Sequence, residues 1–120
     1  MSRITEELRH RTKRYGSAVI RLYVSLPRQK KEIEVLGHQL LRSGTSVAAH
    51  TREASRARSD AEFCSKIEGA LQEADESQLW LEYLMEDCGI SGDVIHGLHK
   101  ESSELIAIFA TISSKLKRRS

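Results

Sequence analysis

The sequence predicts an all-α protein, an antiparallel up-down-up-down four-helix bundle, on three observations. Ala, Leu, Glu, Lys and Arg are abundant, while the 120 residues include one proline and seven glycines, a composition that favours helices over sheets. Core-type residues recur at alternating intervals of three and four in four successive segments. The links between these segments are short, so each helix should run back along the one before it. We expect a single domain spanning residues 1–120.

The first two predicted helices are separated by the single proline, Pro27. A first helix over about residues 3–25 carries the stripe Ile4, Leu8, Arg11, Tyr15, Ala18 and Leu22. Pro27 disfavours helical geometry at Leu26 and suits the first turn of the next helix. That second helix, about residues 28–58, has a heptad stripe of Ile33, Leu36, Leu40, Ser43, Val47, His50, Ala54 and Ala57. Small residues in its second half, Gly44 among them, should let a neighbouring helix approach closely.

The third and fourth predicted helices have clear start signals. Ser59 and Glu62 form the Ser-x-x-Glu pattern of a capping box, so a helix should begin near residue 60 and run to 88. Its stripe is Phe63, Ile67, Ala70, Ala74, Ser77, Leu81, Leu84 and Cys88, with Gly89 placed for a left-handed C-terminal cap. The fourth helix, about residues 92–117, has Asp93 in its first turn and the stripe Ile95, Leu98, Ser102, Leu105, Phe109, Ile112 and Leu116.

A further set of apolar residues lies off these stripes. It comprises Val19, Ile20, Tyr23, Val24, Leu79, Trp80, Tyr83, Met85, Ile106 and Ile108. A four-helix monomer of this size cannot face all of them inward, and surplus apolar surface usually marks an interface. We therefore predict a homo-oligomer. The alternative is a broad monomeric bundle.

Neither a membrane segment nor a secretion signal is expected. No apolar run approaches the roughly 20 residues needed to cross a bilayer, and the first residues lack the apolar stretch of a signal peptide. A cytoplasmic protein follows from this. Cys64 and Cys88 each fall within an apolar stripe, which predicts reduced, buried thiols rather than a disulfide.

The predicted topology gathers basic residues at one end of the bundle. The start of the first helix, the corner between the second and third, and the end of the fourth should meet there. Twelve of the nineteen Lys and Arg residues then lie at this pole against five acids, although the whole chain has a net charge of only +2. The twelve are Arg3, Arg9, Arg11, Lys13, Arg14, Arg52, Arg56, Arg58, Lys115, Lys117, Arg118 and Arg119. Such a field attracts phosphate backbones and supports sequence-independent binding of RNA or DNA. The predicted phosphate contacts are Arg52, Arg56, Arg58, Lys115, Lys117, Arg118 and Arg119.

The alternative for the basic pole is a set of solvated chain ends. Tyr15 is the one aromatic residue near the pole, which favours contacts with the phosphate backbone over contacts with bases.

No constellation of catalytic residues stands out. Glu7 with His10, and His96 with His99, have helical spacing for a metal but supply too few ligands. No Gly-x-Ser-x-Gly elbow and no Gly-rich phosphate loop occurs. We expect no enzyme activity, no cofactor and no metal. The polar residues His50, Glu53, Glu73 and Glu76 are expected to pair structurally with Arg42 or Arg56.

Several motifs, taken in order, resemble a known bacterial family. They are Arg21-Leu22-Tyr23 followed by Leu26-Pro27, the run from Gln39 to His50, Glu53-Ala54-Ser55-Arg56-Ala57, Ser59 to Phe63, and Glu73-Ala74-Asp75-Glu76 with Trp80-Leu81. Over roughly residues 15–90 the chain is similar to four-helix-bundle proteins related to the 23S rRNA intervening-sequence protein. It departs from the family pattern at His50, where Asn is usual, and at Ala54, where Gly is usual.

The resemblance implies a four-helix protomer that commonly assembles into a ring of five, so a pentamer is the expected homo-oligomer. A similar fold serves as the accessory protein of diversity-generating retroelements, where a basic pentameric barrel binds nucleic acid and the reverse transcriptase. No established biochemical activity comes with the family. Two functions therefore stay open: RNA or DNA binding through the basic pole, and a protein-interaction scaffold or accessory subunit for a partner such as a reverse transcriptase, with no nucleic-acid contact.

Overall fold

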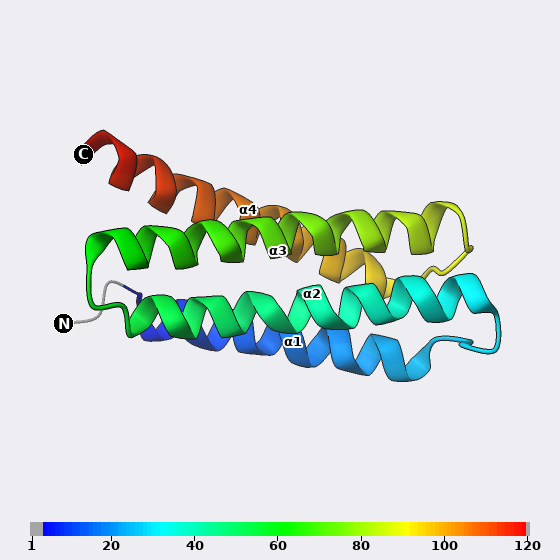
Figure 1. Ribbon diagram of the computed structural model, residues 1–120. Coiled ribbons are helices and arrows are strands. Elements are labelled where there is room, and N and C mark those ends of the chain that lie inside the picture. Colours follow the sequence, from blue (N-terminus) through cyan, green and yellow to red (C-terminus); the bar gives the residue numbers. More distant parts are fainter. Residues whose placement is uncertain (1–3, 120) are drawn as a thin grey trace.

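The computed structural model describes residues 4–119, apart from the side chain of Arg119. This range holds four helices, α1 (Glu6–Ser25), α2 (Lys31–Ser55), α3 (Asp60–Glu86) and α4 (Asp93–Arg119), which confirms the predicted all-α four-helix fold. The molecule is elongated, 47 × 22 × 21 Å. The start of α1, the α2–α3 connection and the end of α4 lie at one end, here called the terminal end (Figure 1). The α1–α2 and α3–α4 connections lie at the other, the distal end.

Local capping sets where α1 and α2 begin. Thr5 caps α1, because its side-chain oxygen accepts a hydrogen bond from the Leu8 N–H at 3.0 Å. Leu26 is extended, as expected before a proline, and ends α1. Pro27 does not enter the next helix: its carbonyl accepts from the Lys30 N–H at 3.5 Å in a turn. Consequently α2 begins at Lys31 instead of residue 28, and it ends at Ser55.

The ends of α3 follow the sequence signals more closely. Ser59 caps the helix by accepting from the Glu62 N–H at 3.1 Å, as predicted. After Glu86 the chain turns through Gly89, with φ +70°, and the Ile90 N–H donates to the Leu84 carbonyl at 3.0 Å. Gly92 has φ +121° directly before α4. Both glycines adopt backbone angles that side chains disfavour, so the α3–α4 connection depends on them.

The core follows the predicted stripes on α3 and along most of α4, whereas α1 and α2 are each rotated slightly. On α1, Thr12 and Val19 are buried, and the predicted Arg11 and Ala18 are only half-buried. The buried apolar positions of α2 are Ile33, Leu40, Val47 and Ala54, whereas Leu36, His50 and Ala57 are only half-buried. Gly37, Gly44 and Thr51, spaced seven apart, are buried instead. A Cβ atom added at Gly44 would lie 2.8 Å from Val19 Cγ2 on α1. The helix is therefore turned to place small residues against α1, and the predicted close approach at Gly44 is confirmed.

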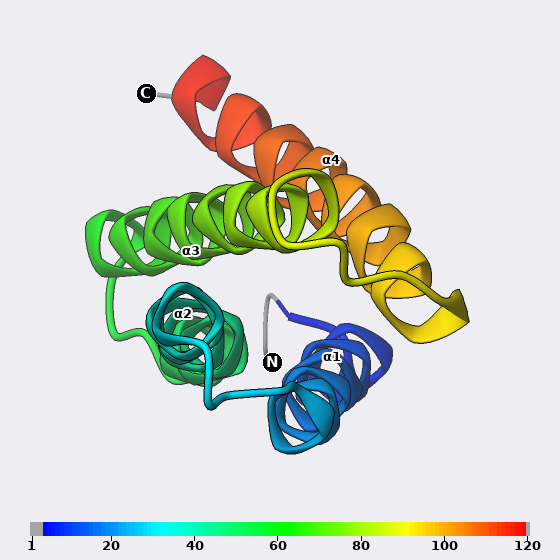
Figure 2. The same cartoon turned by 90° about the vertical axis from the view of Figure 1, so that its right-hand side faces the viewer.

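The fourth helix packs unevenly. Within the described residues the backbones of the diagonal pairs, α1 with α3 and α2 with α4, do not approach each other closely, and of the four adjacent pairs α1 with α4 has the sparsest contact. Figure 2 shows α1 and α3 at diagonal corners of the bundle, and α4 inclined across α3. Both views show the C-terminal end of α4 leaving the side of α1 (Figures 1 and 2). The basic residues of α4 are thus carried away from those of α1.

The apolar residues off the stripes differ in how deeply they are buried. Val19 is fully buried, which contradicts its assignment to surplus surface, because it fits over Gly44. Tyr23, Trp80, Met85, Ile106 and Ile108 are partly buried against the core. The large apolar side chains most exposed in the described residues are Ile20, Val24, Val35, Leu79, Tyr83 and Val94, at 41% to 65%. All six lie in the distal half of the molecule.

Within residues 4–119, no helix is both long enough and apolar enough to cross a membrane. Cys64 and Cys88 are free thiols, as predicted, but each is half-buried rather than buried. The Cys64 thiol donates to Glu68 Oε1 at 3.4 Å. Desolvation, and then the Glu68 carboxylate, raise the pKa of the Cys64 thiol, so the reactive thiolate is disfavoured there.

Candidate nucleic-acid interface

A groove between α1 and α2 at the terminal end collects four exposed cationic side chains. Arg9 and Lys13 come from α1, and Arg52 and Arg56 from the end of α2; the groove encloses about 430 Å³. Within each pair the two residues are four apart, which places them one turn apart on the same face of the helix. Thr5 is the N-terminal cap of α1 and Arg56 is the C-terminal cap of α2. Since both pairs lie near these two helix ends, they lie at the same level of the bundle.

The charges of this groove favour a bound anion. None of its four Arg and Lys side chains has an ion-pair partner within residues 4–119. Glu6 is the one carboxylate that lines the groove, and its Oε1 atom lies 3.4 Å from His10 Nε2. Four cations against a single acid leave a concentrated positive field, which attracts phosphate groups.

Arg11 was counted in the basic pole, yet its side chain is directed at α4. Its Nε and Nη2 atoms donate to the two carboxylate oxygens of Glu101 at 2.6 and 2.8 Å, and Nη2 also donates to Glu104 at 2.8 Å. The hydrogen bond to Glu101 is the main cause that raises the pKa of Arg11 above its ordinary value. This guanidinium is committed to two carboxylates and ties α1 to α4.

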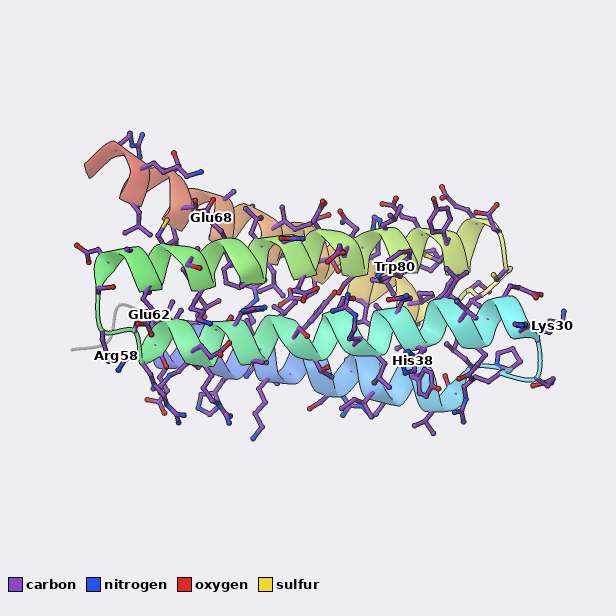
Figure 3. All side chains as sticks on the ribbon, viewed as in Figure 1. Lys30, His38, Arg58, Glu62, Glu68 and Trp80 are labelled. Atoms are coloured by element: carbon purple, nitrogen blue, oxygen red, sulfur yellow. The ribbon has the colours of Figure 1, made fainter. Side chains whose placement is uncertain are left out.

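The other predicted phosphate contacts lie outside the α1–α2 groove. Arg58 Nε is 3.7 Å from Glu62 Oε2 at the α2–α3 connection, where Figure 3 labels both residues. Lys117 Nζ is 3.2 Å from Glu68 Oε2, and this lysine lowers the pKa of Glu68. Lys117 and Arg118 line a second groove, between α3 and α4. Lys115 is exposed on α4, and the side chain of Arg119 lies outside the described residues.

The structure thus joins two of the predicted contacts, Arg52 and Arg56, to two residues that sequence reasoning placed at the pole but did not select. Arg9 and Lys13 have the same four-residue spacing as Arg52 and Arg56, and that shared spacing is the signal that could have identified them. The inclination of α4, which separates its cations from those of α1, has no comparable signal in the sequence.

Tyr15 is not available to stack on a base. Its ring is buried, its hydroxyl oxygen lies 2.6 Å from Ser102 Oγ, and burial raises the pKa of the phenol. The groove therefore offers charges and no aromatic surface, an arrangement suited to phosphate contacts without base recognition.

A polar cluster on the outer side of α2 and α3 has internal partners. Arg42 Nη1 lies 3.3 Å from Glu73 Oε2, while His50 lies 3.9 Å from Glu73 and 3.6 Å from Glu53. This confirms the expected structural pairing with Arg42 for Glu73, whereas Glu53 lies beside His50 and Lys66. The predicted partner Arg56 instead lines the groove. Within residues 4–119 no three His, Cys, Asp or Glu side chains are grouped to hold a metal ion.

Fold and site together define the class of this protein: a small four-helix bundle that presents a cationic groove at one end. The sequence matches the 23S rRNA-intervening sequence protein family over residues 7–111, and the chain belongs to that family. It is similar to a crystal structure of a protein of unknown function from the S23 ribosomal protein family of Bacteroides thetaiotaomicron. The two share 31% identity with a TM-score of 0.79, over 88% of this chain and 96% of the other. A comparison with curated proteins finds no match.

Proposed function

We propose that the protein is a non-enzymatic homo-oligomer, with a pentamer favoured, that binds RNA or DNA through phosphate-backbone contacts at its terminal end. The observation that carries this proposal is the α1–α2 groove, where Arg9, Lys13, Arg52 and Arg56 converge without an ion-pair partner in the described range. The proposed path of the nucleic-acid phosphate backbone continues around the same end along Arg58, Lys115, Lys117, Arg118 and Arg119.

The cationic and the exposed apolar surfaces lie in different halves of the molecule, which supports separate roles in ligand binding and in assembly. The cationic groove lies at the terminal end, while Ile20, Val24, Val35, Leu79, Tyr83 and Val94 are exposed in the distal half. Exposed apolar residues of this kind favour contact with another protein surface. Assembly through the distal half would leave the cations open to a ligand. The positions of the connections in Figure 1 support the up-down-up-down topology on which this polarity depends.

A binding role without catalysis is consistent with the chemistry of the candidate nucleophile and of the groove. The pKa of the Cys64 thiol is raised, which disfavours a thiolate nucleophile. In the groove, His10 lies beside Glu6. Ser55 is the one serine or cysteine among the described residues that line the groove.

The test is to replace Arg9, Lys13, Arg52 and Arg56 by Gln and to measure binding to a mixed RNA pool as salt is varied. We expect affinity to fall at least about tenfold near 0.1 M salt, and the slope of log K against log salt to shrink by about 3. The matched control replaces Arg28, Lys30, Lys31 and Lys100, four exposed cations outside the groove, and should bind nearly as wild type. Equal loss in both variants would point to non-specific charge attraction and would contradict a groove-based site.

The second candidate is a protein-interaction scaffold or accessory subunit, for a partner such as a reverse transcriptase, with no direct nucleic-acid contact. The exposed apolar residues of the distal half favour it. Two results together would establish this alternative over the first. The protein partner would still bind after the four Gln substitutions, and the affinity of the wild-type chain for RNA would not fall as salt is raised.

A further inference from the structure

The outer face of α3 combines acidic charge with exposed apolar side chains. This helix contains eight Asp and Glu residues and a single Lys. Leu79 and Tyr83, one turn apart, are 41% and 42% exposed. Asp75, four residues before Leu79, and Glu86, three after Tyr83, extend the same exposed face. Neither Asp75 nor Glu86 has an ion-pair partner within residues 4–119.

The outer face of α1 also carries an exposed apolar pair, with basic instead of acidic residues near it. Five basic residues outnumber two acidic ones on this helix. Ile20 and Val24, also one turn apart, are 44% and 65% exposed. Arg21, three residues before Val24, is exposed beside this pair, and Arg14 is exposed one step further along α1, on the side that faces α4. Unlike Arg11, neither has an ion-pair partner in the described residues.

The two faces lie on opposite sides of the bundle at a similar level. Figure 2 shows α1 and α3 at diagonal corners, and within the described residues their backbones do not approach each other closely. Both apolar pairs lie in the distal half, and in each pair the four-residue spacing covers about 6 Å of helix rise. Rotation about an axis parallel to the bundle keeps every residue at its own height. Neighbouring copies in a ring could therefore set Ile20 and Val24 against Leu79 and Tyr83.

We infer that copies of this chain associate head-to-tail, with the outer face of α1 in one copy docked on the outer face of α3 in the next. The inference rests on the homo-oligomer of the proposed function and adds the surfaces that build it. Such a contact joins two different surfaces, and it closes into a ring when the rotation between neighbouring copies closes and otherwise gives an open filament. The apolar pairs supply the buried centre, and the charged rim comes from basic Arg14 and Arg21 on one copy and acidic Asp75 and Glu86 on the other.

This docking also bears on the phosphate groove. The acidic face of α3 would repel a polyanion, and covering it with the basic face of a neighbouring copy removes most of that repulsion. Arg9, Lys13, Arg52 and Arg56 lie in the groove between α1 and α2 at the terminal end, apart from the proposed contact, so they stay open to solvent.

The test is a charge exchange across the proposed contact, read by the mass of the full chain in light scattering at micromolar concentration. Arg14→Glu with Arg21→Glu, and separately Asp75→Arg with Glu86→Arg, should each weaken assembly at least tenfold. All four substitutions in one chain should restore it, because the attraction is then re-formed with the signs exchanged. Leu79→Ser with Tyr83→Ser should also dissociate the assembly, and since these residues are exposed, helix content should be unchanged.

The outcomes separate this inference from the proposed function. A wild-type chain that is monomeric would refute the homo-oligomer itself. A wild-type oligomer whose mass is unchanged by either charge reversal, or is not restored by the exchange, would overturn the α1–α3 contact alone. In both cases the salt-dependent RNA binding of the groove is measured independently and stands or falls on its own variants.

Discussion

Gly44 sets the spacing between α1 and α2. An alanine there would place its Cβ 2.8 Å from one Val19 methyl and 2.9 Å from the other. The crowding cost of about 1–3 kcal/mol should exceed the gain in helix propensity of up to about 1 kcal/mol. We expect Gly44→Ala to lower the free energy of unfolding in urea. Gly97→Ala is the matched control: no atom lies within 4 Å of the added methyl, so this variant should be stabilised by up to about 1 kcal/mol. Stabilisation of both variants would contradict the close packing.

The environment of Glu76 predicts how the free energy of unfolding depends on pH. A hydrogen bond with Glu73, desolvation and the Glu73 charge raise the pKa of Glu76 above its ordinary value of 4.5. Because the pKa of Glu76 is higher in the folded state than in the unfolded state, the folded protein loses stability as pH rises from the lower pKa to the higher one. This loss persists at neutral pH. Glu76→Gln should therefore increase the free energy of unfolding near pH 7 and leave it unchanged near pH 3.5. A gain of equal size at both pH values would show that charge repulsion is not its cause.

At the scale of one element, Ser59 is expected to determine how firmly α3 begins. Its side chain accepts from the Glu62 N–H at 3.1 Å. Removing such a cap costs about 1 kcal/mol, so Ser59→Ala should lower the free energy of unfolding by that amount. Ser65→Ala changes an exposed serine inside the same helix and should instead be neutral or slightly stabilising. Similar losses in both would argue against capping as the reason.

The number of helices, and most of their buried faces, could be predicted from the sequence because capping residues and heptad spacing act locally. The rotation of α2 could not. Gly37 and Gly44 carry no hydrophobic signal, and their burial depends on the fit of Val19 and Tyr23 from another helix. Pro27 was misplaced for a related reason: proline suits both a first helical turn and the turn before it.

At the scale of the whole molecule, Arg11 is a principal link across the seam between α1 and α4. Its 26% exposed side chain holds Glu101 and Glu104 of α4, across the adjacent helix pair that has the sparsest contact. Arg11→Met should lower the free energy of unfolding by about 1–3 kcal/mol, since charged hydrogen bonds of this kind are lost. The control Lys100→Met, on exposed α4 surface, should change it by less than about 0.5 kcal/mol. Equal stability of the two variants would contradict a structural role for Arg11.

The candidate site was predictable in charge and only partly in membership. An excess of basic residues at one end is predicted from chain order alone. Which of them share a groove depends on the inclination of α4 and on carboxylates that occupy Arg11 and lie beside Lys117. Such long-range pairings are settled by tertiary geometry, and sequence spacing does not report them.

The placement of α1 and α3 at diagonal corners gives the molecule an electric dipole across its width. Two copies that approach within about 10 Å at 0.1 M ionic strength feel each other's fields, so each turns the other before they touch. Such a torque makes the encounter of unlike faces more frequent than random collision would, and it fades as dissolved ions shorten its reach.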